Sequence, residues 1–344
     1  MIQCNIQLEE VVTAYYQCRK NKRNTDGQLL FELDLEYNLH RLHRDLVCGG
    51  YEISPSICFT VAYPKSREVW AANFRDRIVH HILYNRFAHH FIKQFIRDSF
   101  ACIPNRGTLD GIERAEYHIK SESNNWSEPC FYLKCDFANF FTSIDKTVLW
   151  EIQEPKLRSF NQEDWVIELT KKVLFNDCTK NAVFNSTEIE MNSVPRRKSL
   201  LYAPLNVGLP IGNLSSQLDA NILLNEIDQF AKHRLKIKHY CRYVDDILII
   251  SKSKEQLFNW YSSIVDKSSK LGLTFNPTKT LCHSIRRGVT FIGQTIYPHR
   301  TVPSKSTERR ILKEVVRAGK SLDSYIHFFK QSRNSYNLVH RLAA

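Results

Sequence analysis

The chain has 344 residues and a formal net charge of +12, which suits a polyphosphate partner, although many basic proteins bind none. No segment approaches the roughly 20 consecutive apolar residues that span a bilayer, and the N-terminus lacks a charged-then-apolar signal pattern. We therefore expect a cytoplasmic protein. Its 10 cysteines include no Cys-x-x-Cys pair and no grouping with zinc spacing, so they are predicted to be free, buried thiols.

Helical periodicity appears in three segments before the C-terminal region. Leucines at helical spacing predict one amphipathic helix over residues 29–46, ending at Gly49-Gly50. Charged and apolar residues recur every three or four positions over residues 72–95 and predict a second helix. A third is expected over residues 213–233, with Glu226 and Asp228 facing water. The basic segments 307–320 and 321–344 are expected to form two or three further helices.

Two predicted strand ends carry carboxylates. A short apolar strand over residues 131–136 ends on Asp136, and an aromatic pair follows it at 140–141. Residues 236–243 and 247–250 are rich in β-formers, so the intervening Val244-Asp245-Asp246 is predicted to form the tip of a tight hairpin. Adjacent Asp residues repel one another, and either a divalent cation or full solvation would relieve this. An isolated pair would most simply be a solvated turn.

Three carboxylates on neighbouring strand ends would instead form a hard oxygen site suited to Mg²⁺. Two metals held in this way can orient a 3′-hydroxyl and a triphosphate for in-line displacement. With these residues the chain resembles reverse transcriptases: Asp136 matches the metal-binding Asp of their first palm motif, and Tyr243-Val244-Asp245-Asp246 matches their second. The resemblance implies an α+β right-hand polymerase fold with an antiparallel palm sheet.

The resemblance also implies a domain order. Residues 1–130 would form N-terminal helices and fingers, 131–299 the palm, and 300–344 thumb-like helices. An additional segment at about 176–206 would lie between fingers and palm elements. The length leaves no room for a further nuclease domain beyond these parts.

Further motifs carry the resemblance along the chain. Lys65 and Arg67 match the fingers residues that clamp the incoming triphosphate, and Ile211-Gly212 lies in a segment similar to the loop beneath the nascent base pair. Lys279 matches a lysine thought to protonate the leaving pyrophosphate. An ordinary surface role remains an alternative for Lys279.

The remaining implied site residues are aromatic or lie in a hairpin. Asp136 and Asp245 would bind both metals with the help of the Phe137 carbonyl, while Asp246 would be more peripheral. Phe141 matches the steric gate that excludes a ribose 2′-hydroxyl, although a core role is an alternative. The segment 289–296 resembles the hairpin that grips the primer, through Phe291, Ile292 and Gly293.

One departure from the common pattern concerns the branch of the family. Many reverse transcriptases carry Gln where this chain has Ile211, and that Gln supports fidelity. The difference resembles the unknown-group and type 3 defence-associated bacterial enzymes and the nearby diversity-generating retroelement enzymes. The additional segment 185–206 favours the defence-associated side. Diversity-generating, mutagenic cDNA synthesis remains the first alternative.

The resemblance implies two Mg²⁺ ions, replaceable by Mn²⁺, together with deoxynucleotides, template RNA and a DNA product. The template is expected to be a dedicated non-coding RNA, in a complex with further protein subunits or in a homo-oligomer, with no membrane partner. A template-independent or protein-primed DNA polymerase would use the same metals. A catalytically inactive RNA-holding scaffold is disfavoured because it would not need Asp136, Asp245, Lys65 and Arg67 together.

Overall fold

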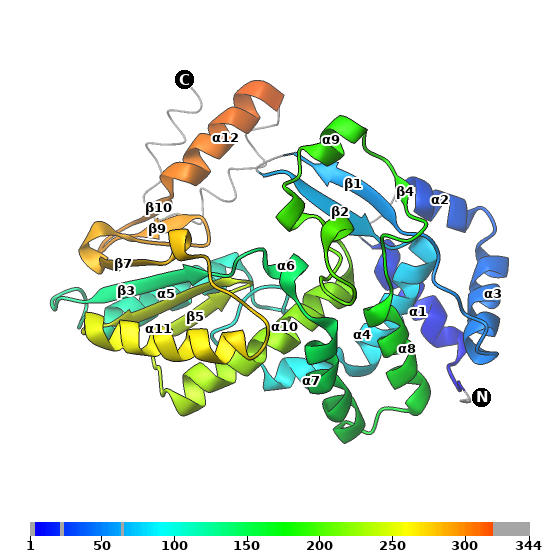
Figure 1. Ribbon diagram of the computed structural model, residues 1–344, viewed down its shortest axis with the longest axis horizontal. Helices are drawn as coiled ribbons and strands as arrows, with labels where there is room; N and C mark the ends of the chain where they lie inside the picture. The colour runs from blue at the N-terminus through cyan, green and yellow to red at the C-terminus, as the bar shows by residue number, and fades with distance from the viewer. Residues whose placement is uncertain (1–3, 21–23, 63–64, 319–344) are drawn as a thin grey trace. The chain divides into compact units, whose positions relative to one another are not determined.

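The computed structural model describes residues 4–20, 24–62 and 65–318 (Figure 1). They divide into two compact units. The first comprises the described residues up to Phe95 with Asn139–Glu226 and Leu271–Leu273, and the second comprises Ile96–Ala138, Ile227–Lys270 and the described residues from Thr274 onward. No helix within these described ranges is both long and apolar enough to cross a membrane.

The second unit is built on a four-stranded sheet in the order β5-β6-β3-β7. Its strands are β5 (Tyr240–Tyr243), β6 (Asp246–Ser251), β3 (Phe131–Asp136) and β7 (Leu281–Ser284), and every neighbouring pair is antiparallel. Helix α5 (Thr108–Glu122) packs through Ile112, Ala115 and Ile119 into a core that includes Leu248 and Ile250 of β6. Helix α11 (Lys254–Ser269) contacts β6 and β3. Between α11 and β7, the 3₁₀ turn Pro277–Lys279 contacts β3.

A second sheet of the same unit follows in the chain. Strands β8 (Val289–Phe291), β9 (Gln294–Ile296) and β10 (Thr301–Pro303) form an antiparallel meander in the order β10-β9-β8. A 3₁₀ turn, Ile285–Arg287, precedes it, and helix α12 (Lys305–Ala318) follows it. The first of the expected basic C-terminal helices is therefore present, whereas the segment 321–344 lies outside the described residues.

The first unit is mainly helical. Its helices are α1 (Leu8–Arg19), α2 (Asp26–Glu32), α3 (Leu35–Val47), α4 (Phe74–Gln94), α6 (Phe140–Ser143), α7 (Lys146–Ser159), α8 (Asp164–Phe175) and α9 (Glu188–Asn192). A small sheet has the order β2 (Arg67–Ala71), β1 (Ile57–Val61), β4 (Val183–Phe184), with β4 as a parallel edge strand. Two 3₁₀ turns, Arg196–Lys198 and Leu200–Tyr202, follow α9. Helix α10 (Leu214–Gln229) begins in this unit and ends in the second, where a π-helical turn, Phe230–Arg234, follows it.

The predicted helix over residues 72–95 is confirmed as α4, which begins where the Asn73 side chain accepts a hydrogen bond from the Arg75 backbone N–H. The single helix predicted over residues 29–46 is wrong, because the chain forms α2 and α3 with a break at Asp34, whose backbone is not helical (φ −135°, ψ 57°). Leu30 and Leu33 are consequently exposed.

Two further expectations are corrected in the second unit. Asp228 does not face water: it is fully buried and bonded to Arg242. The strand predicted from residue 236 begins only at Tyr240, because the π-helical turn and a short bend come first. All 10 cysteines are free as predicted, although Cys48 and Cys102 are exposed.

Candidate active site

The predicted Asp-Asp hairpin is present between β5 and β6. Tyr243 pairs with Asp246, so Val244 and Asp245 form a two-residue loop. Val244 has φ 52°, in the left-handed region that β-branched residues rarely adopt. A positive φ at the first loop residue matches the right-handed twist of the flanking strands. The tight loop therefore holds Asp245 at a defined position at the end of the sheet.

The strand register brings the third carboxylate to the same place. Asp136, the last residue of β3, lies directly opposite Asp246, the first residue of β6. Burial, together with the negative charges of Asp136 and Asp246, raises the pKa of Asp245 to about 6. Burial also raises the pKa of Asp246 above its ordinary value, with Asp136 adding to the effect. The cluster therefore concentrates negative charge at the ends of β3 and β6.

Two lysines partly balance this charge. Lys134 Nζ lies 2.8 Å from Asp246 Oδ2, and Lys279 Nζ lies 2.7 Å from Asp136 Oδ2. The Asn276 backbone N–H donates to the Asp136 carbonyl, which ties the turn that carries Lys279 to the end of β3. Lys134 was not predicted from the sequence, although its position two residues before Asp136 places it on the same face of β3.

The cluster retains unused capacity for a cation. Among the described residues, Oδ1 of Asp136 and Oδ1 of Asp246 are buried and have no hydrogen-bond partner. A buried carboxylate oxygen without a partner is unfavourable unless a ligand satisfies it. Carboxylate oxygens are the ligands that Mg²⁺ and Mn²⁺ prefer, so the donor set fits a hard divalent cation.

A second group of possible ligands lies deeper in the same unit. One donor atom each of Asp98, His118 and Cys241 lies within 4.8 Å of the others. Asp98 already accepts from Arg114 and Lys232, each at 2.6 Å, and from His118 at 3.1 Å. Burial alone would raise the pKa of Asp98, but these bonds hold it well below its ordinary value. A metal ion there would have to displace two cations, so the hairpin cluster fits a metal ion better.

Phe137 follows the cluster and is committed to the core. Its ring is buried and stacks on Phe275 with centroids 4.2 Å apart. The Ala138 backbone N–H donates to the Thr274 carbonyl, which fixes the chain as it leaves β3. The ring therefore cannot face a substrate, and only the Phe137 backbone is suited to the predicted role.

The segment predicted to grip the primer forms the β8–β9 hairpin. Phe291 is fully buried, while Ile292 (φ 47°) and Gly293 (φ 77°) form its two-residue loop. Positive φ at both positions is the geometry of a type I′ turn. The Gly293 carbonyl accepts from the Ser304 N–H and the Thr307 hydroxyl, which anchor the loop to the start of α12.

In the first unit, part of the predicted nucleotide-binding set gathers along β2. Arg67 is the first residue of this strand, Lys65 lies two residues before it, and both are exposed. The Trp70 N–H donates to the Ile211 carbonyl, so Ile211-Gly212 runs beside β2. Gly212 has φ 119°, and a Cβ there would lie 2.8 Å from Val69 Cγ1. The close approach therefore requires glycine.

The two aromatic residues that follow the cluster, Phe140 and Phe141, differ in burial. Phe140 is 3% exposed, whereas Phe141 is only partly buried, with ring centroids 5.2 Å apart. Phe140 is thus the core residue of the two, and the predicted role of Phe141 remains compatible with its exposure.

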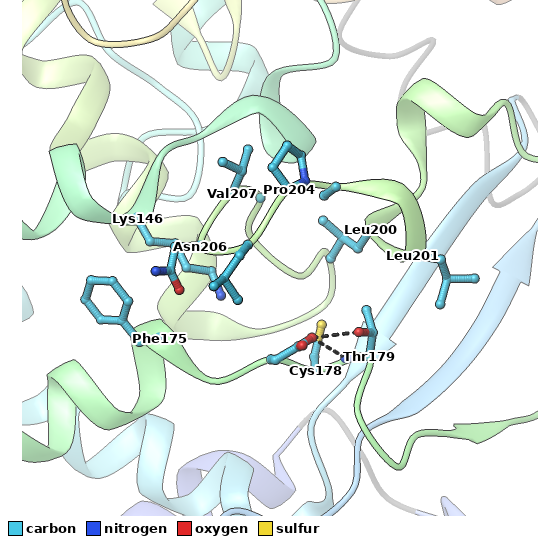
Figure 2. A pocket seen from close by; sticks show the side chains of 13 residues that line it. Lys146, Phe175, Cys178, Thr179, Leu200, Leu201, Pro204, Asn206 and Val207 are labelled. Carbon is cyan, nitrogen blue, oxygen red and sulfur yellow. Dashed lines mark hydrogen bonds between the residues drawn. The ribbon is translucent and has the colours of Figure 1, made fainter.

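A pocket of about 280 Å³ in the first unit contains none of the predicted site residues (Figure 2). It lies between the end of α8 and the segment 200–208, and its charged groups are already bonded. Lys146 Nζ donates to the Asn176 carbonyl, and Asp177 accepts from Thr179. The pocket therefore offers no array of unused catalytic groups comparable with the carboxylate cluster.

Residues 63–296 match the family model of the reverse transcriptase (RNA-dependent DNA polymerase). The chain belongs to this family of nucleotidyltransferases, and the expected α+β polymerase fold with an antiparallel sheet is confirmed. Reverse transcriptase domains generally depend on divalent metal ions.

Two solved telomerase structures from Candida tropicalis are similar to parts of the chain. The apo enzyme truncated from its C-terminal domain has 14% identity and a TM-score of 0.45, covering 76% of this chain and 58% of that one. The apo telomerase has 12% identity and a TM-score of 0.46, covering 72% and 48%. The chain thus spans about half the length of these telomerase chains. No curated protein shows significant similarity to it.

Proposed function

We propose that the chain extends a 3′-hydroxyl with deoxynucleotides on an RNA template, using the cluster of Asp136, Asp245 and Asp246. The observation that carries this proposal is the pair of buried carboxylate oxygens without partners at the ends of β3 and β6. A charged cluster in this state needs a cation, and family membership indicates which reaction the cation serves.

The three carboxylates and the Phe137 carbonyl would hold two divalent metal ions. When bound, these ions activate the attacking hydroxyl and neutralise charge on the triphosphate. Asp136 and Asp245 would help to hold both ions, and Asp246 would take a more peripheral position. Lys134 keeps Asp246 oriented through its 2.8 Å contact.

The remaining roles rest on the matching motifs. Lys65 and Arg67 bind the triphosphate, while Ile211-Gly212 supports the nascent base pair. Lys279 protonates the leaving pyrophosphate, and the exposed ammonium it presents beside Asp136 is compatible with this role. The hairpin of Phe291, Ile292 and Gly293 holds the primer end.

The biological setting belongs to the same proposal. The enzyme would act in the cytoplasm with a dedicated non-coding RNA and further protein subunits, in anti-phage defence. Ile211 in place of the common Gln, with the additional segment 185–206, supports this branch. Mutagenic copying in a diversity-generating element is the alternative that Ile211 also fits. Sequencing the DNA that the enzyme makes during phage infection separates them, because mutagenic copying leaves substitutions at template adenines.

The chemistry is tested by Asp136→Asn and Asp245→Asn in primer extension on RNA with Mg²⁺. Each change removes a metal-binding charge from a strand end, so we expect loss of nucleotide addition without loss of the fold. Asp110→Asn, at an exposed ion pair with Arg97, serves as the control and should retain activity. Wild-type extension by either cluster variant would refute the assignment. Product formed without template would instead indicate the template-independent alternative.

The sugar gate is tested by comparing Phe141→Ala with Phe140→Ala. Phe141→Ala should admit ribonucleotides, whereas Phe140→Ala should mainly destabilise the protein, by about 3–5 kcal/mol, because it leaves a buried cavity. Incorporation ratios of ribonucleotides to deoxynucleotides and thermal unfolding measure the two effects. The reverse pattern would assign the gate to Phe140.

A further inference from the structure

Behind the Asp-Asp hairpin lies an ion pair with no solvent exposure. The side chains of Arg242, on β5, and Asp228, near the end of α10, are both 0% exposed. Arg242 Nε lies 2.8 and 3.0 Å from the two Asp228 oxygens, and Nη2 lies 2.7 Å from Oδ2. A desolvated pair of this kind is no more stabilising than a well-packed apolar pair, so its geometry calls for another explanation.

The third nitrogen of the guanidinium contacts the hairpin loop. Arg242 Nη1 donates to the Val244 carbonyl at 3.0 Å. This carbonyl belongs to the peptide group that joins Val244 to Asp245. Val244 holds φ 52°, which a β-branched residue adopts only under constraint from its surroundings. The bond therefore fixes the peptide plane immediately before Asp245.

Arg242 is itself held from both sides. Its backbone N–H donates to the Asp98 carbonyl at 2.9 Å, and its carbonyl accepts from the Phe100 N–H at 3.1 Å. The Tyr240 hydroxyl donates to Asp228 Oδ1 at 2.7 Å and fixes the carboxylate. Although burial alone would lower the pKa of Arg242, the Asp228 carboxylate raises it above its ordinary value. The guanidinium is therefore a charged donor in a fixed position.

We propose that Arg242 is a positioning residue for nucleotide addition: anchored by Asp228, it holds the Val244–Asp245 peptide so that the Asp245 carboxylate is preorganised for a divalent cation. The proposal rests on the proposed function, since it assumes that Asp245 binds metal. It explains why a buried charge lies behind the hairpin, because a planar guanidinium can bind a carboxylate with one edge and a carbonyl with another.

Arg242→Lys tests the proposal, with Tyr240→Phe as the matched control. A lysine can keep the charge pair with Asp228, but one ammonium cannot reproduce the guanidinium's separate contacts to Asp228 and Val244. Tyr240→Phe removes a bond to the same carboxylate and leaves the Val244 contact in place. The double variant Asp228→Leu/Arg242→Met removes the contact without leaving a buried charge unpaired, and it covers the case in which Arg242→Lys does not fold.

Binding of Mn²⁺ to the full chain, followed by electron paramagnetic resonance, gives a readout independent of activity. Steady-state extension with Mg²⁺ supplies kcat and the KM for deoxynucleotide. We expect Arg242→Lys and the double variant to weaken Mn²⁺ binding and to lower kcat by about 10-fold or more, the usual effect of losing a group that orients a metal ligand. KM should change little, and Tyr240→Phe should alter Mn²⁺ affinity and kcat by no more than about twofold.

Two outcomes would overturn the proposal. Mn²⁺ affinity and kcat near the wild-type values in both contact-breaking variants would show that the Val244 bond does not position Asp245. An equal loss in Tyr240→Phe would show that the network acts only through stability. Asp245→Asn, measured in parallel, separates these results from failure of the proposed function, since its activity and Mn²⁺ binding must fall if Asp245 is a ligand.

Discussion

Two hairpins of the second unit place a β-branched residue at positive φ in a two-residue loop: Val244 at 52° and Ile292 at 47°. The Ile292 loop is supported by apolar contact. An ideal Cβ on Gly111 of α5 would lie only 2.5 Å from Ile292 Cδ1, so the isoleucine occupies space that only glycine leaves free. The Val244 loop is supported instead through its carbonyl, by the buried guanidinium of Arg242.

The difference follows from what each loop carries. The β8–β9 loop contains no ionisable residue, so its side chain can be packed against the core. The β5–β6 loop carries Asp245 beside Asp246, and burying it in the same way would remove the carboxylates from solvent and from any cation. A hydrogen bond from behind can fix the backbone while the three carboxylates stay partly exposed.

The largest expected effect comes from breaking the Asp228–Arg242 pair behind the β5–β6 hairpin. Asp228→Ala leaves the Arg242 charge buried without its partner, which should lower the free energy of unfolding by about 3–5 kcal/mol. Urea unfolding measures the change. Glu128→Ala, at the exposed pair with Lys252, is the control and should leave the free energy of unfolding nearly unchanged. Equal losses of unfolding free energy in Asp228→Ala and Glu128→Ala would show that the buried pair matters no more to stability than the exposed one.

Gly111→Ala disturbs the apolar contact between α5 and Ile292 that supports the β8–β9 hairpin. The added methyl group would meet Ile292 Cδ1 at 2.5 Å and the Phe100 ring at 3.3 Å, so overpacking should cost about 1–3 kcal/mol. Adding Ile292→Val to this variant should recover part of the loss in thermal unfolding. Gly107→Ala, where no atom lies within 4 Å of the new Cβ, provides the comparison. No recovery in the double variant would argue against Ile292 as the contact.

The two hairpins should also differ in their response to pH. Because burial and like charges raise the pKa of Asp245 from 3.8 to about 6, the folded state binds its proton more tightly than the unfolded state. Without metal, stability should therefore fall as pH rises from about 4 to about 6, by roughly 1 kcal/mol after solvent screening. Asp245→Asn should remove this component, whereas the cost of Gly111→Ala should not vary with pH. An unchanged pH profile in Asp245→Asn would contradict the prediction.

The smallest effect is expected for Val244→Gly. Relief of the positive φ offsets the greater backbone freedom of glycine in the unfolded chain, so stability should change by no more than about 1 kcal/mol. Ile292→Gly should cost more, because it also removes the contact near Gly111. Calorimetry of both variants would test this, and a larger loss for Val244→Gly would show that its side chain supports the loop.

The sequence predicted the parts of this site that depend on local pattern. Alternation and turn residues identify β3, the β5–β6 hairpin and the position of Asp136 in the sheet. The burial of Asp228 could not be read from helical periodicity, because its partner Arg242 comes from a different element and reverses the usual preference of a carboxylate for water. The break at Asp34 was missed because leucine spacing alone suggested a continuous helix.

The central position of β3 in the sheet restricts how the chain can change in length. β3 pairs with β6 on one side and β7 on the other, and Asp136 is its last residue. Because side chains alternate between faces, deleting one residue from β3 would turn either Asp136 or the core residues to the wrong face. The edge strand β4 has only two residues and pairs only with β1, so a change of length near it would shift far fewer strand pairs. Natural or engineered insertions should therefore accumulate near β4, while the length of β3 stays constant.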